Sequence, residues 1–167
     1  MSNVYAYENK VSRGLDPIIA TFPEWLNQVK DTAPRADLMF ELSGAGGSGG
    51  VWTGYSFQTF YDRVQAMAAA LRAMGLKKGM VAALMARNSL AWDVFHFACL
   101  YQGIVVVGVD YYAPADYKNS IFKACSPACI FIDSVDQLEN VRLGDGVRIV
   151  ASHPPFVFGS EQVFDYN

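Results

Sequence analysis

The spacing of apolar residues changes several times along the chain, and each change predicts a boundary between secondary-structure elements. Between residues 57 and 74, apolar side chains recur at helical spacing while polar side chains take the opposite face. Ser56 precedes this run as a candidate N-cap, and Gly75 follows it where a C′ glycine would end a helix. We therefore expect an amphipathic helix here.

Two β-prone runs precede this helix, at 38–42 and 51–57, and a loop of glycine and serine, residues 43–50, lies between them. Such a pair indicates an antiparallel hairpin with a long mobile tip. A shorter amphipathic helix is expected earlier, over 16–30, with Pro23 in an early turn. Its apolar side consists of Phe22, Trp25, Leu26 and Val29.

Beyond Gly75, unbroken apolar runs alternate with helical segments. The expected strands are 80–86, 104–109, 128–132 and a shorter run at 147–151, the first three typical of strands buried on both faces. The expected helices are 89–103, which is apolar nearly all round and should be largely enclosed, and 114–125, which Pro114 opens. This alternation indicates right-handed βαβ crossovers and a mostly parallel sheet.

The sequence thus predicts one α/β domain over residues 1–167, with a mostly parallel sheet, flanking helices and no internal repeat. The hairpin is assigned to 38–56 and the βαβ core to about 57–151. Residues 133–146 form a polar connection within this core. The tail, 152–167, contains two adjacent prolines and no clear period, so it is expected to be irregular.

Composition narrows the classes of function. With 52% hydrophobic and 17% charged residues, the chain lies outside the disordered class. A net charge of −3 without a basic run argues against nucleic acid as a partner. No apolar stretch reaches the roughly 18 residues of a membrane span, and the N-terminus lacks the order of a signal peptide. Three cysteines suit a reducing compartment, so we expect a cytoplasmic protein.

The glycine loop spells G-x-G-x-x-G from Gly44 to Gly49, a pattern that can bind a dinucleotide. That use requires a helix directly after the loop, whereas 51–57 is β-branched and aromatic. Asp62 lies at an acceptable distance for the acidic residue but falls on the polar face of the later helix. A hairpin tip is therefore favoured over a dinucleotide site, and shortening the loop should cost little stability.

Histidine and cysteine offer no catalytic or metal-ligating arrangement. His96 lies in the apolar helix near Trp92, which favours a core or boundary histidine over a catalytic base, and His153 precedes two prolines in a loop. Cys125 and Cys129 are separated by three residues and have no second pair, so buried small side chains are favoured over zinc ligands. We assign no catalytic residue and no metal ligand.

Ligands of parallel α/β sheets lie beyond the carboxyl ends of the strands. Arg87 at such an end could meet a phosphate, and Asn88 could equally cap the following helix. Capping and solvation in a loop are the favoured interpretations for the whole set. The candidate cofactor-binding residues at these ends are Arg87, Asn88, Asp110, Tyr111 and Asp133, with Ser134 beside the last.

An ordered series of motifs carries a family resemblance over roughly residues 20–150. The motifs are YSFQTF, MGLKKGM, RNSLAW and YQGIVVVGVDYYAP. Together they resemble the opening of the adenylate-forming superfamily, which contains acyl-CoA synthetases, peptide-synthetase adenylation domains and luciferases. The segment LKKGMV lacks the family's usual acidic residue, and VGVDYY lacks its usual proline. The segment VDQLENV is similar to the long-chain fatty acyl-CoA branch.

The resemblance implies an enzyme that uses ATP, magnesium and coenzyme A on a carboxylic acid, here a fatty acid. The family's Ser/Thr/Gly-rich phosphate loop, its Y-G-x-T-E segment and its later catalytic residues do not occur before Asn167. We therefore expect the N-terminal part of such an enzyme, inactive alone and without a bound cofactor. Its expected partner is the remainder of the enzyme, or another copy, at an exposed sheet edge.

Two alternatives stay open at this point. The chain could be a naturally short binding or interaction module that keeps the start of the adenylate-forming fold. A nucleotide-binding oxidoreductase, suggested by the glycine loop alone, is the more distant possibility.

Overall fold

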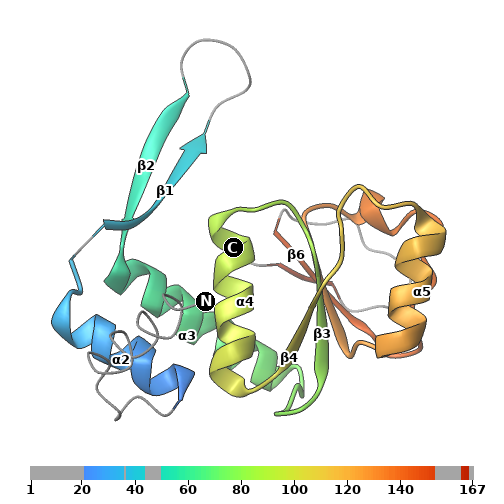
Figure 1. The fold of residues 1–167 in the computed structure, drawn as a ribbon, viewed down its shortest axis with the longest axis horizontal. Helices are drawn as coiled ribbons and strands as arrows, with labels where there is room; N and C mark the ends of the chain where they lie inside the picture. Colours follow the sequence, from blue (N-terminus) through green and yellow to red (C-terminus); the bar gives the residue numbers. More distant parts are fainter. Residues whose placement is uncertain (1–20, 36, 44–49, 153–162, 166–167) are drawn as a thin grey trace, which may run out of the picture.

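The computed structural model describes residues 21–35, 37–43, 50–152 and 163–165 (Figure 1). Its elements, in chain order, are α2 (Phe22–Thr32), β1 (Asp37–Ser43), β2 (Val51–Ser56), α3 (Phe57–Ala73), β3 (Val81–Met85), α4 (Leu90–Gln102), β4 (Val105–Gly108), α5 (Ala115–Cys125), β5 (Cys129–Ile132), the 3-10 helix η1 (Val135–Leu138), β6 (Arg148–Ala151) and β7 (Val163–Asp165).

Five of the strands form one sheet in the order β4-β3-β5-β6-β7, and every neighbouring pair is parallel. The remaining two, β1 and β2, form a separate antiparallel hairpin. The predicted α/β class, with a mostly parallel sheet, flanking helices and a preceding hairpin, is confirmed.

Helices cover both faces of the parallel sheet (Figure 1). On one face, α3 and α4 pack with residues of α2 in a core where the rings of Phe95 and Phe131 stack at 4.8 Å between centroids. On the other face, Phe122 of α5 packs with Ile130, Ile132 and Ile149. The strands thus separate two apolar cores, because alternate side chains of a strand point to opposite faces.

The helix boundaries follow local capping chemistry. The Ser56 hydroxyl accepts a hydrogen bond from the Thr59 amide at 3.2 Å, and Gly75 takes the left-handed conformation after α3, with φ of +82°. Both were predicted. For α4, by contrast, the N-cap is Ser89, whose hydroxyl accepts from the Trp92 amide at 3.2 Å. Asn88 therefore does not cap this helix.

Two strands differ from the sequence prediction. The run 104–109 was expected to be buried on both faces, but β4 is the edge strand of the sheet and Val105 is 51% exposed. The tail from residue 152 was expected to be irregular, yet β7 adds a parallel strand beside β6, with Val150 opposite Phe164. The rest of that tail, 153–162 and 166–167, lies outside the described residues.

The hairpin projects from the helical side of the molecule (Figure 1). Its strands pair from Asp37 with Ser56 to Ser43 with Val51. The expectation that the glycine loop lies between two strands is confirmed, which removes the helix that a dinucleotide fingerprint needs. The loop itself, residues 44–49, lies outside the described residues, so its mobility stays a prediction.

Candidate functional site

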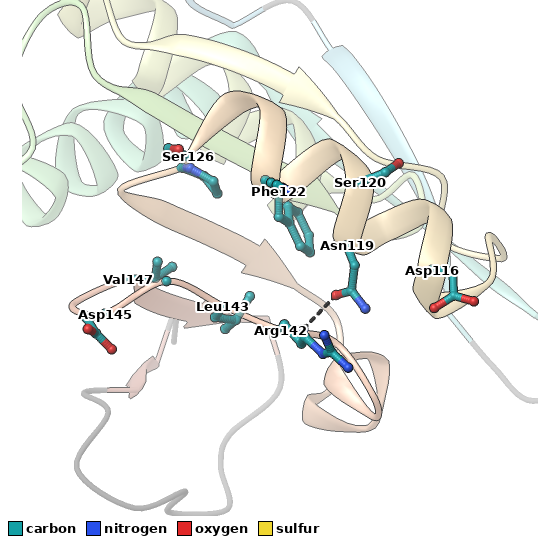
Figure 2. A pocket seen from close by; sticks show the side chains of 12 residues that line it. Asp116, Asn119, Ser120, Phe122, Ser126, Arg142, Leu143, Asp145 and Val147 are labelled. Carbon is teal, nitrogen blue, oxygen red and sulfur yellow. Dashed lines mark hydrogen bonds between the residues drawn. The ribbon is translucent and has the colours of Figure 1, made fainter.

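A groove of about 640 Å³ lies between α5 and the segment that leads into β6 (Figure 2). Asn119 of α5 connects the two sides of this groove. The Asn119 side-chain oxygen accepts from the Arg142 amide at 2.6 Å, and the Asn119 side-chain nitrogen donates to the Asn140 carbonyl at 3.1 Å. Two carboxylates and two cations line it, so it has no single sign of charge. They are Asp116, Asp145, Lys123 and Arg142. The sequence singled out none of these residues.

The carboxyl ends of the parallel strands offer a second location. After β3 the chain passes to α4 on one face, whereas after β4 and β5 it passes to α5 and η1 on the other. Both sides of β3 are therefore topological switch points, where open α/β sheets bind ligands. One crevice lies between β3 and β5, and the other between β3 and β4.

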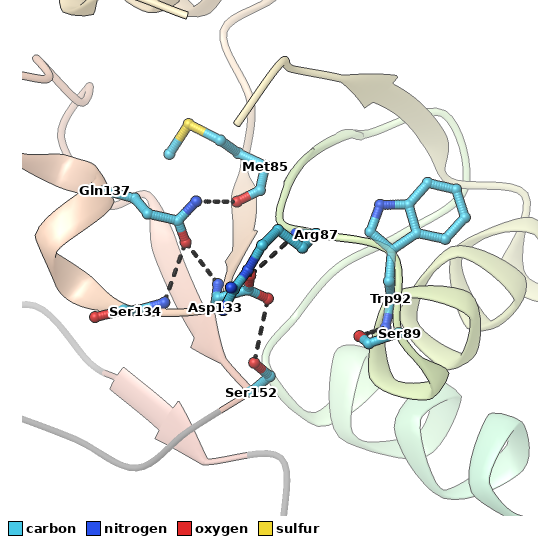
Figure 3. Close-up of polar contacts among 8 residues, drawn as sticks. All are labelled: Met85, Arg87, Ser89, Trp92, Asp133, Ser134, Gln137 and Ser152. Atoms are coloured by element: carbon cyan, nitrogen blue, oxygen red, sulfur yellow. Dashed lines mark hydrogen bonds and ion pairs between the residues drawn. The ribbon is translucent and has the colours of Figure 1, made fainter. Parts of the chain in front are cut away.

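Side chains fill the crevice between β3 and β5 (Figure 3). The Asp133 carboxylate is buried, and one of its oxygens accepts from both the Arg87 amide at 3.0 Å and the Arg87 Nε at 2.9 Å. Its other oxygen accepts from the Ser152 hydroxyl at 3.5 Å. Asp133 thus ties together the ends of β3, β5 and β6.

Gln137 completes this closure from η1 (Figure 3). Its side-chain oxygen accepts from the amides of Asp133, at 2.7 Å, and Ser134, at 3.1 Å, while its nitrogen donates to the Met85 carbonyl at 2.9 Å. Neither Gln137 nor Ser152 was predicted from the sequence. The pattern Ser134-x-x-Gln137, which forms a capping box, was the signal that could have revealed Gln137.

The crevice between β3 and β4 is an open depression of about 500 Å³. The Arg87 guanidinium lies 5.4 Å from the centre of the Tyr111 ring, which packs edge-on against Tyr112 at 4.7 Å. Asp110 shapes the loop, because its carboxylate accepts from the Tyr112 amide at 2.9 Å. The residues that line this depression are Leu84, Ala86, Arg87, Asn88, Trp92, Gly108, Val109, Asp110, Tyr111 and Tyr112.

The structure therefore brings the strand-end candidates into two adjoining groups. Asp133 lies in the closed crevice, Asn88, Asp110 and Tyr111 line the open one, and Arg87 joins them. The hydrogen bond to Asp133 is the main cause that raises the pKa of Arg87 above its ordinary value. Arg87 is consequently a permanent cation at this edge.

These donors do not fit a nucleoside triphosphate with magnesium. Among the described residues that line the depression, Arg87 is the single cation and Asp110 is an anion, and the Arg87 guanidinium is already paired with the Asp133 carboxylate. A triphosphate needs an excess of cationic and amide donors. Within the described residues, no group of three or more His, Cys, Asp or Glu side chains could hold a metal ion.

The remaining candidates occupy packing positions. His96 is half-buried, with its ring 5.2 Å from Trp92 and 6.0 Å from Phe97, both edge-on, which matches the expected boundary histidine. Burial raises the pKa of Asp93, in the same helix, and His96 partly offsets that rise. His153 lies outside the described residues.

The cysteines are free thiols. Cys99 and Cys129 are buried, whereas Cys125 is half-buried, so the predicted role as small core side chains is confirmed for Cys129 and only partly for Cys125. Burial raises the pKa of Cys129 to about 12 and also raises that of Cys99. Buried, protonated thiols are poor nucleophiles and poor metal ligands.

The fold and its strand ends define a class: an α/β protein with a parallel sheet between two helical layers, preceded by a hairpin. The model of the family described as AMP-binding enzyme matches residues 28–163. The chain therefore belongs to the AMP-binding enzyme family.

Known proteins resemble this chain over most of its length. The "Long-chain-fatty-acid–CoA ligase heimdall" of Drosophila melanogaster is 26% identical over 123 residues, which make up 73% of this chain and 18% of the ligase. Solved structures also share the fold. One is NpsA-ThdA, an artificially fused adenylation–PCP di-domain NRPS from Klebsiella oxytoca, with TM-score 0.64 and 18% identity over 78% of this chain and 24% of that one.

The second is the fatty acid AMP ligase from Legionella pneumophila, with TM-score 0.63 and 17% identity over 78% of this chain and 23% of that one. This chain thus spans about a fifth to a quarter of the length of the relatives it matches. Among the described residues, no helix has the length and apolar character needed to cross a bilayer.

Proposed function

We propose that this chain is the N-terminal part of an acyl-CoA synthetase, which activates a carboxylic acid with ATP and transfers the acyl group to the thiol of coenzyme A. The observation that carries the proposal is the family match over residues 28–163, which includes the hairpin, both helical layers and the whole parallel sheet up to the start of β7. Magnesium would accompany the ATP in the complete enzyme.

The proposed substrate class is the long-chain fatty acids. The relative from Drosophila melanogaster is by name a ligase of these acids, and it is 26% identical to this chain. The segment 135–141, which forms η1 and the residues after it, resembles the same branch. A cytoplasmic location is the matching proposal, because coenzyme A and ATP are both available there.

This chain alone is proposed to be inactive. The donors at its strand ends do not suit a triphosphate, and its described residues hold no metal-binding cluster. We propose that Arg87 and Asp133 support the sheet edge, while Asn88, Asp110 and Tyr111 line a shallow wall beside it. In this view no residue of the chain acts as a catalytic group.

The exposed edge of β4 is the proposed site of contact with the remainder of the enzyme or with another copy. Val105 is half-exposed there, and an edge strand presents unpaired backbone groups. A second candidate is a naturally short interaction module. One observation favours it: the described residues already close an apolar core on each face of the sheet.

Exchange of pyrophosphate into ATP tests the proposal. We expect no fatty-acid-dependent exchange by residues 1–167, and measurable exchange by the protein whose reading frame includes this chain and continues past Asn167. Exchange by the 167-residue chain would refute its proposed inactivity. A stop codon directly after Asn167 would instead favour the short module.

A further inference from the structure

One face of the hairpin carries large apolar side chains that the described residues leave uncovered. The pairing places Leu42 opposite Trp52 and Phe40 opposite Gly54, so these four residues share one face. Phe40 is 59% exposed, Leu42 53% and Trp52 65%. Gly54, opposite Phe40, adds no side chain to this face. We call this surface the hairpin apolar face.

The opposite face of the hairpin is the one that anchors it. Met39 lies opposite Tyr55 there, and both pack against the core formed by α3 and α4. The Arg63 guanidinium of α3 lies 5.1 Å from the centre of the Tyr55 ring. The hairpin apolar face therefore points away from the core that holds the hairpin in place.

An isolated two-stranded hairpin is at best marginally stable in water, and a third strand or a packed layer normally stabilises it. Here three large side chains on one face remain more than half exposed. Phe40, Leu42, Trp52 and Gly54 carry no charge, so a nucleic acid or an acidic peptide would gain no ion pair from these four residues. Its chemistry fits an apolar protein surface that excludes water.

The length of the relatives supports one choice of occupant for this face. Both strands lie within the region matched by the family model, so the hairpin is part of the shared domain and not an addition to it. The structures that share the fold contain about four times as much chain as the part matched here. The surface that covers the hairpin is therefore expected in the later part of that same domain.

We infer that the hairpin apolar face, made by Phe40, Leu42, Trp52 and Gly54, docks an apolar surface of the polypeptide that follows Asn167 in the same enzyme. This inference rests on the proposed function, because it requires a longer chain. It assigns the hairpin to the assembly of the domain, separately from the β4 edge.

Hydroxyl-radical footprinting read by mass spectrometry tests the inference, with rates normalised to those of the urea-unfolded protein. In the 167-residue chain, Trp52 should oxidise as an exposed indole. In the protein that continues past Asn167, this oxidation should be lost. Unchanged oxidation of Trp52 in the longer protein would overturn the inference. So would protection that appears in the 167-residue chain at concentrations where it dimerises, since the occupant would then be a second copy.

A matched pair of variants gives an independent readout. Trp52→Thr and Tyr117→Ala each remove an exposed aromatic ring, Tyr117 being 54% exposed on α5, and each introduces a residue favoured in its element. Trp52→Thr should leave the melting temperature of the short chain unchanged and lower that of the longer protein. Tyr117→Ala should change neither. An equal effect of Trp52→Thr in both proteins would contradict docking.

Pyrophosphate exchange on the same longer protein separates the two proposals. Exchange with an exposed Trp52 would refute the docking surface and leave the proposed function standing. A protected Trp52 without exchange for any fatty acid would refute the function and leave the docking surface standing. A reading frame that ends at Asn167 would contradict both.

Discussion

At the scale of single residues, Arg87 and Asp133 form an ion pair whose two side chains differ in burial. The Asp133 side chain is buried, whereas that of Arg87 is 62% exposed. Asp133 also accepts from the Arg87 amide and from the Ser152 hydroxyl, so it holds backbone and side chains of three strand ends. Removing the carboxylate leaves several donors without an acceptor. Removing the guanidinium instead leaves each carboxylate oxygen with a protein donor, one with the Arg87 amide and the other with the Ser152 hydroxyl.

We therefore predict that Asp133→Ala lowers the free energy of unfolding by about 1–3 kcal/mol, the cost of leaving buried hydrogen-bonding groups unsatisfied. Urea denaturation followed by circular dichroism measures it. Asp110→Ala is the matched control, because that exposed carboxylate accepts only from the Tyr112 amide. An equal loss in both variants would show that the burial of Asp133 has no energetic role.

The buried thiols predict how stability depends on pH. Burial raises the pKa of Cys129 to about 12, although the charge of Arg148 lowers it somewhat. In the unfolded chain the pKa of a cysteine is about 8.5. The folded state therefore favours the protonated thiol, so this contribution is complete below pH about 8.5 and is lost as pH rises toward 12.

Stability should accordingly decline at alkaline pH, and less steeply in Cys129→Ala than in the parent chain. Cys125→Ala serves as the control, because Cys125 is only half-buried, although burial also raises its pKa. Urea denaturation at a series of pH values gives both slopes. If Cys125→Ala flattened the alkaline decline as much as Cys129→Ala, burial of Cys129 would not be its cause.

At the scale of elements, the start of α4 gives a sharp test. The Ser89 hydroxyl accepts from the Trp92 amide, whereas Asn88 makes no hydrogen bond to the helix. Ser89→Ala should therefore cost about 1 kcal/mol, the usual cost of losing an N-cap, and Asn88→Ala should cost little. Thermal unfolding of the two variants decides the matter. A larger loss of stability from Asn88→Ala than from Ser89→Ala would show that Asn88, and not Ser89, caps the helix.

The same elements show what the sequence could predict. The helix 57–73 could be predicted from the helical period of its apolar residues and from Ser56 and Gly75 at its ends. Capping depends on residues next to the helix in sequence, so it can be recognised without knowing the fold. The edge position of β4 could not be predicted, because its run of valines is as apolar as the sequence of the enclosed strand β3. Only the order of the strands in the sheet shows which of the two lies at the edge. The strand β7 was missed because it is held by pairing with β6, and three residues show no period.

At the scale of the whole molecule, parallel topology made part of the candidate site predictable. The carboxyl ends of parallel strands meet at one edge, so the sequence alone assigned both Arg87 and Asp133 to that edge of the sheet. That they bond to each other and fill a crevice was not predictable, because the outcome depends on the order β3-β5. Gln137 and Ser152 join from later segments whose positions only the fold supplies.

The position of β3 in the sheet also governs how the molecule can be assembled. Val81 pairs with Val105, and Ala82 pairs with Cys129, so both neighbours of β3 come much later in the chain. Such non-local pairing gives a high contact order and slow folding. During synthesis on the ribosome, one edge of this apolar strand stays unpaired until β4 emerges and the other until β5 emerges. In that interval the nascent chain most needs protection from aggregation.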